Sequence, residues 1–195
     1  MGTGAGKRSG SVSITIYLVR HGEAASSWDQ SLDPGLSARG ERQAIDIASQ
    51  IHQEIPPVAL FSSPLLRTRE TSRPLADLWQ QEPLVAPELS EVPSAGLDLG
   101  GRRAWLDKVL AGRWSEQSDH LQHWRSTILE FTGRQTQDAV FFTHFVVINA
   151  IVSALEGSDN VIVFRPDHCS VTKIRLSGDG MELIEKGREA VTVVK

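Results

Sequence analysis

Three short apolar segments, each followed by a stretch predicted to be helical, constrain the fold of this chain more than any other feature. The segment 13–20 (SITIYLVR) is rich in β-branched and apolar residues on both alternating faces, which is typical of a strand buried on both sides. Residues 58–62 and 138–143 predict two further strands. Because strands alternate with helices, the sequence predicts an α/β domain with helices on both faces of a parallel or mixed sheet.

Capping and helix-breaking residues mark the first two helices. Ser37 is expected to cap a helix that ends at Pro56-Pro57. Its apolar face is expected to consist of Ala44, Ile45, Ala48 and Ile51. Ser63 is expected to cap a second helix, with Pro64 at its first position and Pro74 interrupting or kinking it.

The second half of the chain continues the alternation. Residues 102–135 have helical periodicity, and a helix over 146–155 is predicted to follow the strand 138–143. The β-branched runs at 161–164, 170–176 and 190–194 predict strands, and the residues Ser-Gly-Asp-Gly at 177–180 predict a turn.

Charge and cysteine content exclude several classes of protein. The 195 residues contain 20 Lys and Arg against 24 Asp and Glu, a net charge of -4, so we expect no nucleic-acid partner. The single cysteine, Cys169, excludes an intrachain disulfide and fits a reducing compartment. No apolar run approaches the roughly 20 residues of a membrane helix, so we expect a cytoplasmic protein without a membrane partner. Residues 1–11 are expected to form a flexible tail, and residues 12–195 one domain.

Reactive polar residues follow three of the predicted strands. They are Arg20-His21-Gly22-Glu23, Ser63 with Arg67 just beyond it, and His144. In open α/β sheets, ligands bind beyond the carboxyl ends of the strands, so we expect these side chains to form a compact cationic pocket. Arginine matches phosphate oxygens with forked donors, and imidazole can act as a nucleophile or a base. Gly22 is expected to form a tight turn that lets the backbone approach a ligand.

Four motifs in a fixed order carry a resemblance to a known family. They are Leu18-Val19-Arg20-His21-Gly22-Glu23, residues 36–44 (LSARGERQA), residues 63–71 (SPLLRTRET), and His144 after an apolar strand. Together they resemble the histidine phosphatase superfamily, also called phosphoglycerate mutase-like, and most of all its short phosphatase members. The resemblance covers about residues 13–176. It implies a three-layer αβα sandwich with a mostly parallel central sheet.

The resemblance also implies the roles of the pocket residues. His21 matches the family residue that attacks phosphorus and forms a phosphohistidine. Arg20, Arg67 and His144 match the residues that hold the transferred group and neutralise its charge. The implied chemistry needs neither a metal ion nor another cofactor.

The acid of the family protonates the leaving oxygen and then activates water. Glu91 is the best match for it, and Glu88 is the alternative. The chain departs from the family pattern at three positions, where it has Ala24, Ser27 and Phe145. Ser27 can still donate one hydrogen bond to a phosphate, while the ring of Phe145 is expected to narrow the pocket or to favour an apolar leaving group.

Several other polar residues have simpler structural explanations. The pair His120 and His123 is expected on a solvated helix face rather than in a metal site. His168 precedes a predicted strand near the pocket and is expected to be structural. Glu23 either belongs to the pocket or orients a neighbour. The Arg102-Arg103 pair is expected to begin a helix, with contact to a second acidic group of the substrate as the alternative.

The sequence thus predicts a metal-independent phosphomonoesterase that acts on a small phosphorylated substrate or a phosphoprotein. A phosphoglycerate mutase is the nearest rival, but such enzymes usually carry a longer insertion after the acid, where this chain has only residues 100–105 (GGRRAW). A phosphohistidine or phosphoprotein phosphatase is a second rival. A non-catalytic module that binds phosphorylated ligands is a third, although such a module would be expected to lack His21.

Overall fold

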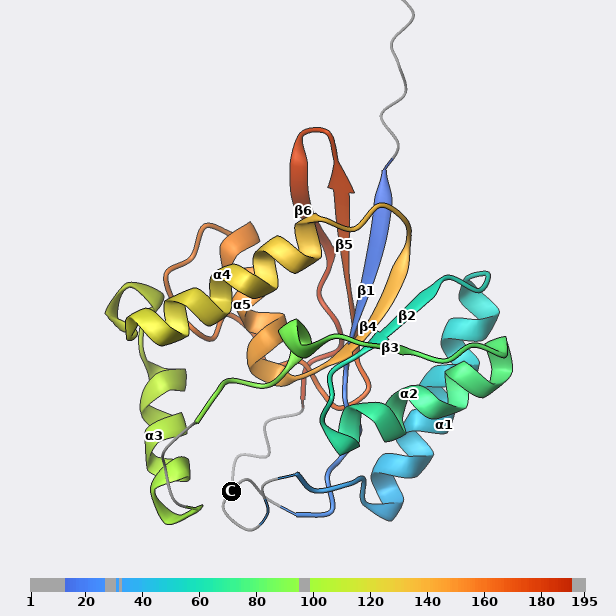
Figure 1. The fold of residues 1–195 in the computed structure, drawn as a ribbon, viewed down its shortest axis with the longest axis horizontal. Helices are drawn as coiled ribbons and strands as arrows, with labels where there is room; N and C mark the ends of the chain where they lie inside the picture. Colours follow the sequence, from blue (N-terminus) through green and yellow to red (C-terminus); the bar gives the residue numbers. More distant parts are fainter. Residues whose placement is uncertain (1–12, 27–30, 32, 95–98, 191–195) are drawn as a thin grey trace, which may run out of the picture.

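A six-stranded sheet forms the centre of the computed structural model, which describes residues 13–26, 31, 33–94 and 99–190 (Figure 1). The strands are β1 (Ile14–Arg20), β2 (Ala59–Ser62), β3 (Leu84–Val85), β4 (Ala139–Thr143), β5 (Val171–Ser177) and β6 (Gly180–Glu185). Their order is β3-β2-β4-β1-β5-β6. The first four strands in this order are parallel, and β5 and β6 are antiparallel to their neighbours, so the sheet is mostly parallel.

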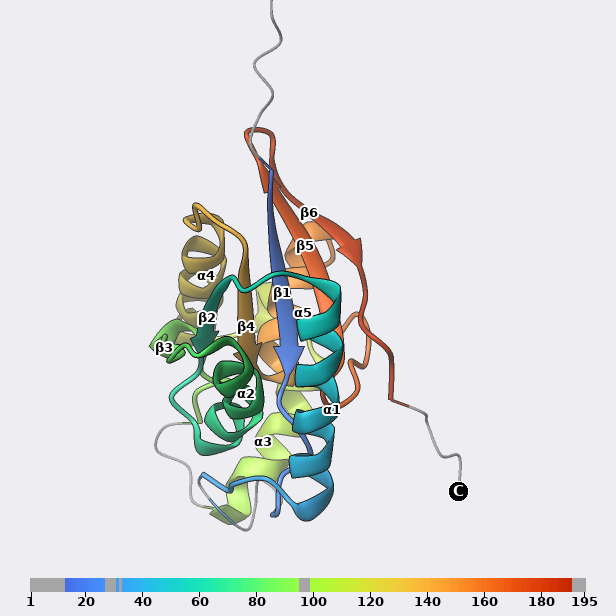
Figure 2. The same cartoon turned by 90° about the vertical axis from the view of Figure 1, so that its right-hand side faces the viewer.

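Helices cover both faces of the sheet (Figure 2). They are α1 (Ala38–Glu54), α2 (Leu66–Trp79), α3 (Leu99–Ala111), α4 (Asp119–Gly133) and α5 (Phe145–Leu155), with short 3-10 turns at Pro87–Leu89 and Trp114–Glu116. Within the described ranges, none of the helices has the length and apolar character needed to cross a membrane.

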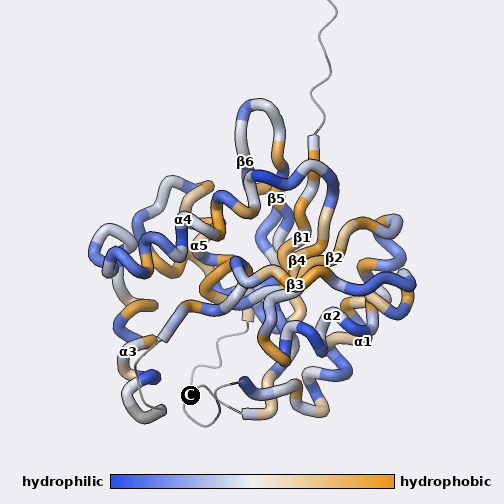
Figure 3. Tube along the Cα trace, in the orientation of Figure 1, coloured by the Kyte–Doolittle hydropathy of each residue, from blue (hydrophilic) through white to orange (hydrophobic). Residues whose placement is uncertain are grey.

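Successive side chains of β1 point to opposite faces of the sheet and pack in two separate hydrophobic cores. Leu18 packs in the core beneath α4 and α5, while the next residue, Val19, packs in the core beneath α1 and α2. Both are fully buried. The apolar residues concentrate at the sheet and at the inner sides of the helices (Figure 3). The expected three-layer αβα sandwich is therefore confirmed.

Parallel pairing gathers the functional segments at one edge of the sheet. β1, β2 and β4 are parallel neighbours, so their carboxyl ends lie together. β5 runs antiparallel to β1, with Val171 opposite Val19, so the start of β5 lies at this same edge. β1 points toward the end of the molecule at which α3 lies (Figure 2).

The first helix begins as predicted but presents a different apolar face. Ser37 caps α1, and its Oγ accepts a hydrogen bond from the N–H of Gly40 at 3.0 Å. Ile45 is 55 % exposed, and Ile47 is buried in its place. Ile47 lies three residues after Ala44 and four before Ile51, which puts these three side chains on one stripe, whereas Ile45 lies outside it.

The second helix differs from the prediction at its start and at Pro74. It begins at Leu66, and Ser63 does not cap it. Pro74 lies inside α2 and does not interrupt it. The residues after the proline, Leu75, Ala76 and Trp79, are buried against α1 and the sheet, and this packing keeps the helix continuous despite the lost hydrogen bond.

The C-terminal part lacks one of the predicted strands and contains another strand that was not predicted. Residues 161–164 form no strand, because the N–H groups of Val163 and Phe164 donate instead to Oδ1 of Asn149 on α5, at 2.9 and 3.2 Å. β6 follows the turn at 177–180 and was not predicted. The expected tail 1–11 and residues 191–194 of the last expected strand lie outside the described residues.

Candidate active site

A cleft of ≈ 440 Å³ opens where the carboxyl ends of β1, β2 and β4 meet. The polar side chains in its lining include Arg20, His21, Arg67, Glu91 and His168. They come from the end of β1, from α2, from the loop after β3 and from the segment before β5. The sheet topology therefore brings together residues that are up to 148 positions apart in the sequence.

His21 follows β1 and is almost completely buried. Its Nδ1–H donates to the carbonyl of Gly22 at 2.7 Å, and its Nε2 accepts from Nε–H of Arg67 at 3.2 Å. A guanidinium can only donate, so these partners assign the proton to Nδ1 and the lone pair to Nε2. Burial, together with the charges of Arg67 and Arg20, holds the pKa of His21 well below its usual value. The ring is thus a neutral imidazole with its nucleophilic nitrogen at Nε2.

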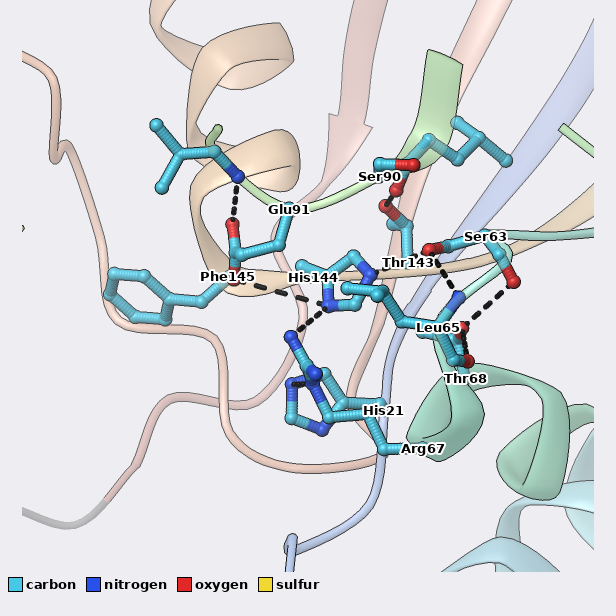
Figure 4. A network of polar contacts seen from close by, with 12 residues as sticks. His21, Ser63, Leu65, Arg67, Thr68, Ser90, Glu91, Thr143, His144 and Phe145 are labelled. Atoms are coloured by element: carbon cyan, nitrogen blue, oxygen red, sulfur yellow. Dashed lines mark hydrogen bonds and ion pairs between the residues drawn. The ribbon is translucent and has the colours of Figure 1, made fainter. Parts of the chain in front are cut away.

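His144 follows β4 and is fully buried. Its Nδ1 accepts from Nη2 of Arg67 at 3.1 Å, which leaves its Nε2–H to donate to Oγ of Ser63 at 2.8 Å (Figure 4). Its ring centroid lies 5.3 Å from that of His21. Burial and the charge of Arg67 lower its pKa as well.

Arg67 connects the two imidazoles from the first turn of α2, with only 3 % of its surface exposed. Its Nη1 lies 3.9 Å from Oδ1 of Asp33, whose Oδ1 also accepts from the N–H of Leu66 at 2.8 Å. Burial lowers the pKa of Arg67, but an arginine stays charged in proteins. The two histidines therefore share one fixed cation.

Arg20 is the second cation of the cleft. Its Nη1 donates to the carbonyl of Pro166 at 2.8 Å, and its guanidinium lies over the ring of Phe145, 5.2 Å from the centroid. Its Nε is buried and has no hydrogen-bond partner in the part of the chain that the structure describes. A buried donor without a partner is costly, and an anion bound beside it would satisfy it.

Glu91 lies after β3 with its side chain 8 % exposed. One oxygen accepts from the N–H of Val92 at 3.0 Å, and Oε2 lies 3.9 Å from Nδ1 of His144. Burial raises the pKa of this carboxyl, although Arg67 and Arg20 oppose the rise. Glu88, the alternative acid, instead lines a separate hollow with His120 and His123 of α4. The structure therefore places Glu91, and not Glu88, in the cleft.

The remaining predicted residues differ in their placement. The N–H of Gly22 donates to Oγ1 of Thr71 at 3.0 Å, and a Cβ at Gly22 would lie 2.7 Å from the carbonyl oxygen of Gly40. This position therefore needs a glycine so that α1 can approach. Phe145 lines the cleft, and Ser27 lies outside the described residues.

Glu23 lines the cleft and also fixes the start of α1. Its Oε1 accepts from Oγ of Ser37 at 2.8 Å, and its Oε2 lies 3.3 Å from Nη1 of Arg39. Its backbone N–H donates to Gln43 at 2.9 Å. These contacts indicate a structural role for Glu23 at the rim of the cleft.

Two residues that were expected near the pocket make contacts that the sequence did not predict. Ser63 accepts from His144 rather than capping α2, although its position directly after β2 could have indicated this. His168 lines the cleft, with its ring centroid 5.9 Å from that of His21. It precedes β5, whose antiparallel pairing with β1 brings it close to His21. Burial and the charge of Arg20 lower the pKa of His168 to about 4.

Comparisons with known proteins agree with this geometry. A sequence model of the histidine phosphatase superfamily (branch 1) matches residues 16–188. A metal-independent phosphoserine phosphatase of Arabidopsis thaliana is 37 % identical over 82 residues, which are 40 % of this chain and 32 % of that protein. A probable phosphoglycerate mutase of Enterobacter sp. (strain 638) is 30 % identical over 124 residues, which are 61 % of this chain and 51 % of that protein. The chain thus spans about half or less of the length of these relatives.

A solved structure shares the fold over nearly the whole chain. The alpha-ribazole phosphatase from Shigella flexneri superposes with a TM-score of 0.71 at 19 % identity, covering 93 % of this chain and 100 % of that one. The match of the family model extends from β1 to the segment after β6 and includes every residue of the polar cleft. This chain therefore belongs to the histidine phosphatase superfamily, branch 1.

Proposed function

We propose that this chain is a metal-independent phosphomonoesterase that works through a phosphohistidine on His21. The observation that carries the proposal is the guanidinium of Arg67, which donates to both His21 and His144 inside a buried cleft. Such a site offers a neutral nucleophile beside fixed donors, which is the arrangement that transfer of a phosphoryl group requires. Membership of the superfamily supports the same chemistry.

In the first step, Nε2 of His21 attacks phosphorus in line with the ester bond. A P–N bond forms while the bond from phosphorus to the ester oxygen breaks. Glu91 donates its proton to the leaving oxygen, and its raised pKa keeps the carboxyl protonated closer to neutral pH. Arg20 and Arg67 hold the phosphoryl oxygens throughout and stabilise the charge of the transition state. His144, whose Nε2–H is donated to Ser63, supports this step by accepting from Arg67 and so orienting its guanidinium.

In the second step, water releases the phosphate. The carboxylate of Glu91 accepts a proton from water, whose oxygen attacks phosphorus as the P–N bond breaks. Inorganic phosphate leaves, the electron pair returns to Nε2 of His21, and Glu91 is again protonated. The two steps together convert a phosphate monoester and water into an alcohol and phosphate.

The test is turnover of 4-nitrophenyl phosphate in the presence of a chelator. His21→Ala is expected to lower kcat by about three orders of magnitude or more, because it removes the nucleophile. His123→Ala, an exposed histidine on α4, is the matched control and is expected to keep full activity. Rapid quenching of the unchanged protein with substrate is expected to trap a base-stable, acid-labile phosphoenzyme. Full turnover by His21→Ala would contradict the proposal.

The same assays separate the rival functions. A phosphoglycerate mutase would interconvert phosphoglycerates when primed with a bisphosphoglycerate and would release little phosphate. A phosphoprotein phosphatase would prefer a phosphopeptide over every small ester. A module that only binds phosphorylated ligands would bind phosphate tightly without forming a phosphoenzyme.

A further inference from the structure

One side of the cleft has no role in the chemistry proposed above. We call it the apolar wall, and it consists of Leu106 and Leu110 of α3 with Phe145 and Val146 of α5. Leu106, Leu110 and Phe145 are only partly buried by the protein, so they retain surface that a ligand could cover. Burial of such surface favours binding in proportion to the apolar area covered.

The wall lies where a leaving alcohol would emerge. In-line attack places the ester oxygen on the side of phosphorus opposite Nε2 of His21, and Glu91 must reach that oxygen. Glu91 and Phe145 extend to the same side of His144 (Figure 4). The guanidinium of Arg20 lies over the ring of Phe145, which ties this ring to the phosphate end of the cleft. An alcohol that leaves past Glu91 therefore meets the apolar wall first.

The cations that line the cleft match the charge of one phosphate group. Among the lining residues that the structure describes, the permanent cations are Arg20 and Arg67, which match the two negative charges of a phosphate monoester. The acidic residues of this lining are Glu91 and, at the rim, Glu23.

We propose that the substrates are phosphate monoesters of uncharged alcohols that carry an apolar aryl or alkyl group next to the ester oxygen. This inference rests on the proposed function and specifies the class of substrate. A second anionic group on the alcohol would lose its hydration against the apolar wall without gaining a partner, and such a loss is costly. Monoesters whose alcohol carries a carboxylate as a second anionic group are therefore poor substrates.

Two further arginines lie near the cleft but outside its described lining. Arg39 lies at the rim, where it pairs with Glu23 at 3.3 Å and is 69 % exposed. Arg102, near the start of α3, donates from Nε to Oγ of Ser94 at 2.8 Å, and its charge reaches Arg67. If either arginine bound a second anion of the substrate, the preference for uncharged alcohols would be reversed.

The direct test compares two esters that differ by one charged group. The full chain is assayed in chelator with phenyl phosphate and with 4-carboxyphenyl phosphate, and kcat/KM is measured for each. We expect kcat/KM to be higher for phenyl phosphate by about tenfold or more. Equal or faster hydrolysis of the carboxylated ester would overturn this inference while leaving the proposed function intact. Failure to hydrolyse either ester or to form a phosphoenzyme would overturn the proposed function, and this inference with it.

Two opposite substitutions at one position of the wall locate the contact. Leu110→Arg is expected to shift the ratio of kcat/KM toward the carboxylated ester, and Leu110→Asp to shift it further away. Inhibition by inorganic phosphate is expected to stay unchanged in both, because the wall does not hold the phosphoryl group. Leu78→Arg, a 48 % exposed leucine on α2, is the matched control and is expected to leave the ratio unchanged.

Thermal unfolding checks that the Leu110 variants fold. If either variant fails to fold, the ratio measured with the unchanged protein decides the proposal alone. If both fold and leave the ratio unchanged, the leaving group does not contact this wall and the inference is wrong.

Discussion

Arg67 donates its Nε–H to Nε2 of His21 across 3.2 Å. The contact occupies the ring nitrogen that we propose as the nucleophile, while the carbonyl of Gly22 holds the proton on Nδ1. We expect a phosphoryl group that enters the cleft to compete for the donors of Arg67 and so to release the lone pair of Nε2. The charge of Arg67 also lowers the pKa of His21, which keeps the ring neutral. In the proposed mechanism, Arg67 thus couples the binding of phosphate to the release of the nucleophilic nitrogen of His21.

Two substitutions of Arg67 distinguish the effect of its charge from the effect of its forked guanidinium. Arg67→Lys keeps the cation but loses the fork, and we expect kcat/KM to fall by about 100-fold. Arg67→Ala also removes a charge that disfavours protonation of His21, so the pKa of His21 rises. The acidic limb of the profile of kcat/KM against pH therefore moves to higher pH in Arg67→Ala and stays in place in Arg67→Lys. Identical limbs in the two variants would show that Arg67 does not set this pKa.

The identity of the proton donor is tested with substrates of different leaving groups. Glu91→Gln is expected to lower kcat/KM by about 100-fold or more for an alkyl phosphate, whose alcohol must be protonated as it leaves. The loss is expected to be much smaller for 4-nitrophenyl phosphate, because 4-nitrophenolate leaves without a proton. Glu88→Gln is the control and is expected to leave both rates unchanged. A larger loss in Glu88→Gln would reverse the assignment.

Ser63 positions His144 by accepting its Nε2–H at 2.8 Å. Ser63→Ala leaves this buried donor without its acceptor, so we expect the free energy of unfolding to fall by about 1 to 3 kcal/mol. We also expect kcat to fall, because His144 loses the partner that fixes its tautomer and ring orientation. Ser63→Thr retains a hydroxyl and is expected to recover much of both losses. Loss of stability without any loss of kcat would limit Ser63 to a structural role.

The sequence predicted the parts of the site that depend on local rules. Arg20, His21 and His144 lie at the ends of strands that are recognisable from their own composition, and Arg67 lies in the first turn of α2. His168 was expected near the pocket but not in contact with His21, because this contact depends on the pairing of Val19 with Val171 across the sheet. Such a pairing is set by the whole fold and leaves no signal within a short window of sequence.

The same distinction explains the errors in the elements themselves. Ser63 and Pro64 have the local pattern of a helix start. The hydroxyl of Ser63 instead accepts from the buried Nε2–H of His144, and the helix begins at Leu66. The run 161–164 has the composition of a strand, but Asn149 satisfies its backbone from α5. In both places a tertiary hydrogen bond outweighs the local preference.

The buried histidines of the cleft predict that the fold loses stability in acid. Burial and Arg20 lower the pKa of His168 from its usual value of 6.5 to about 4. Between these two values the unfolded chain binds a proton that the folded chain does not, so the free energy of unfolding decreases as the pH falls through this window. His21 and His144, whose pKa values are lowered in the same direction, add to this decrease in the free energy of unfolding.

His168→Asn removes one group that takes up a proton on unfolding. The slope of the free energy of unfolding against pH is therefore expected to become shallower, by up to about 1 kcal/mol per pH unit. Urea unfolding between pH 7 and pH 4 measures the slope, with the exposed His120 changed to Asn as the control that keeps it. A slope in His168→Asn equal to that of the unchanged protein would mean that His168 is not desolvated in the folded cleft.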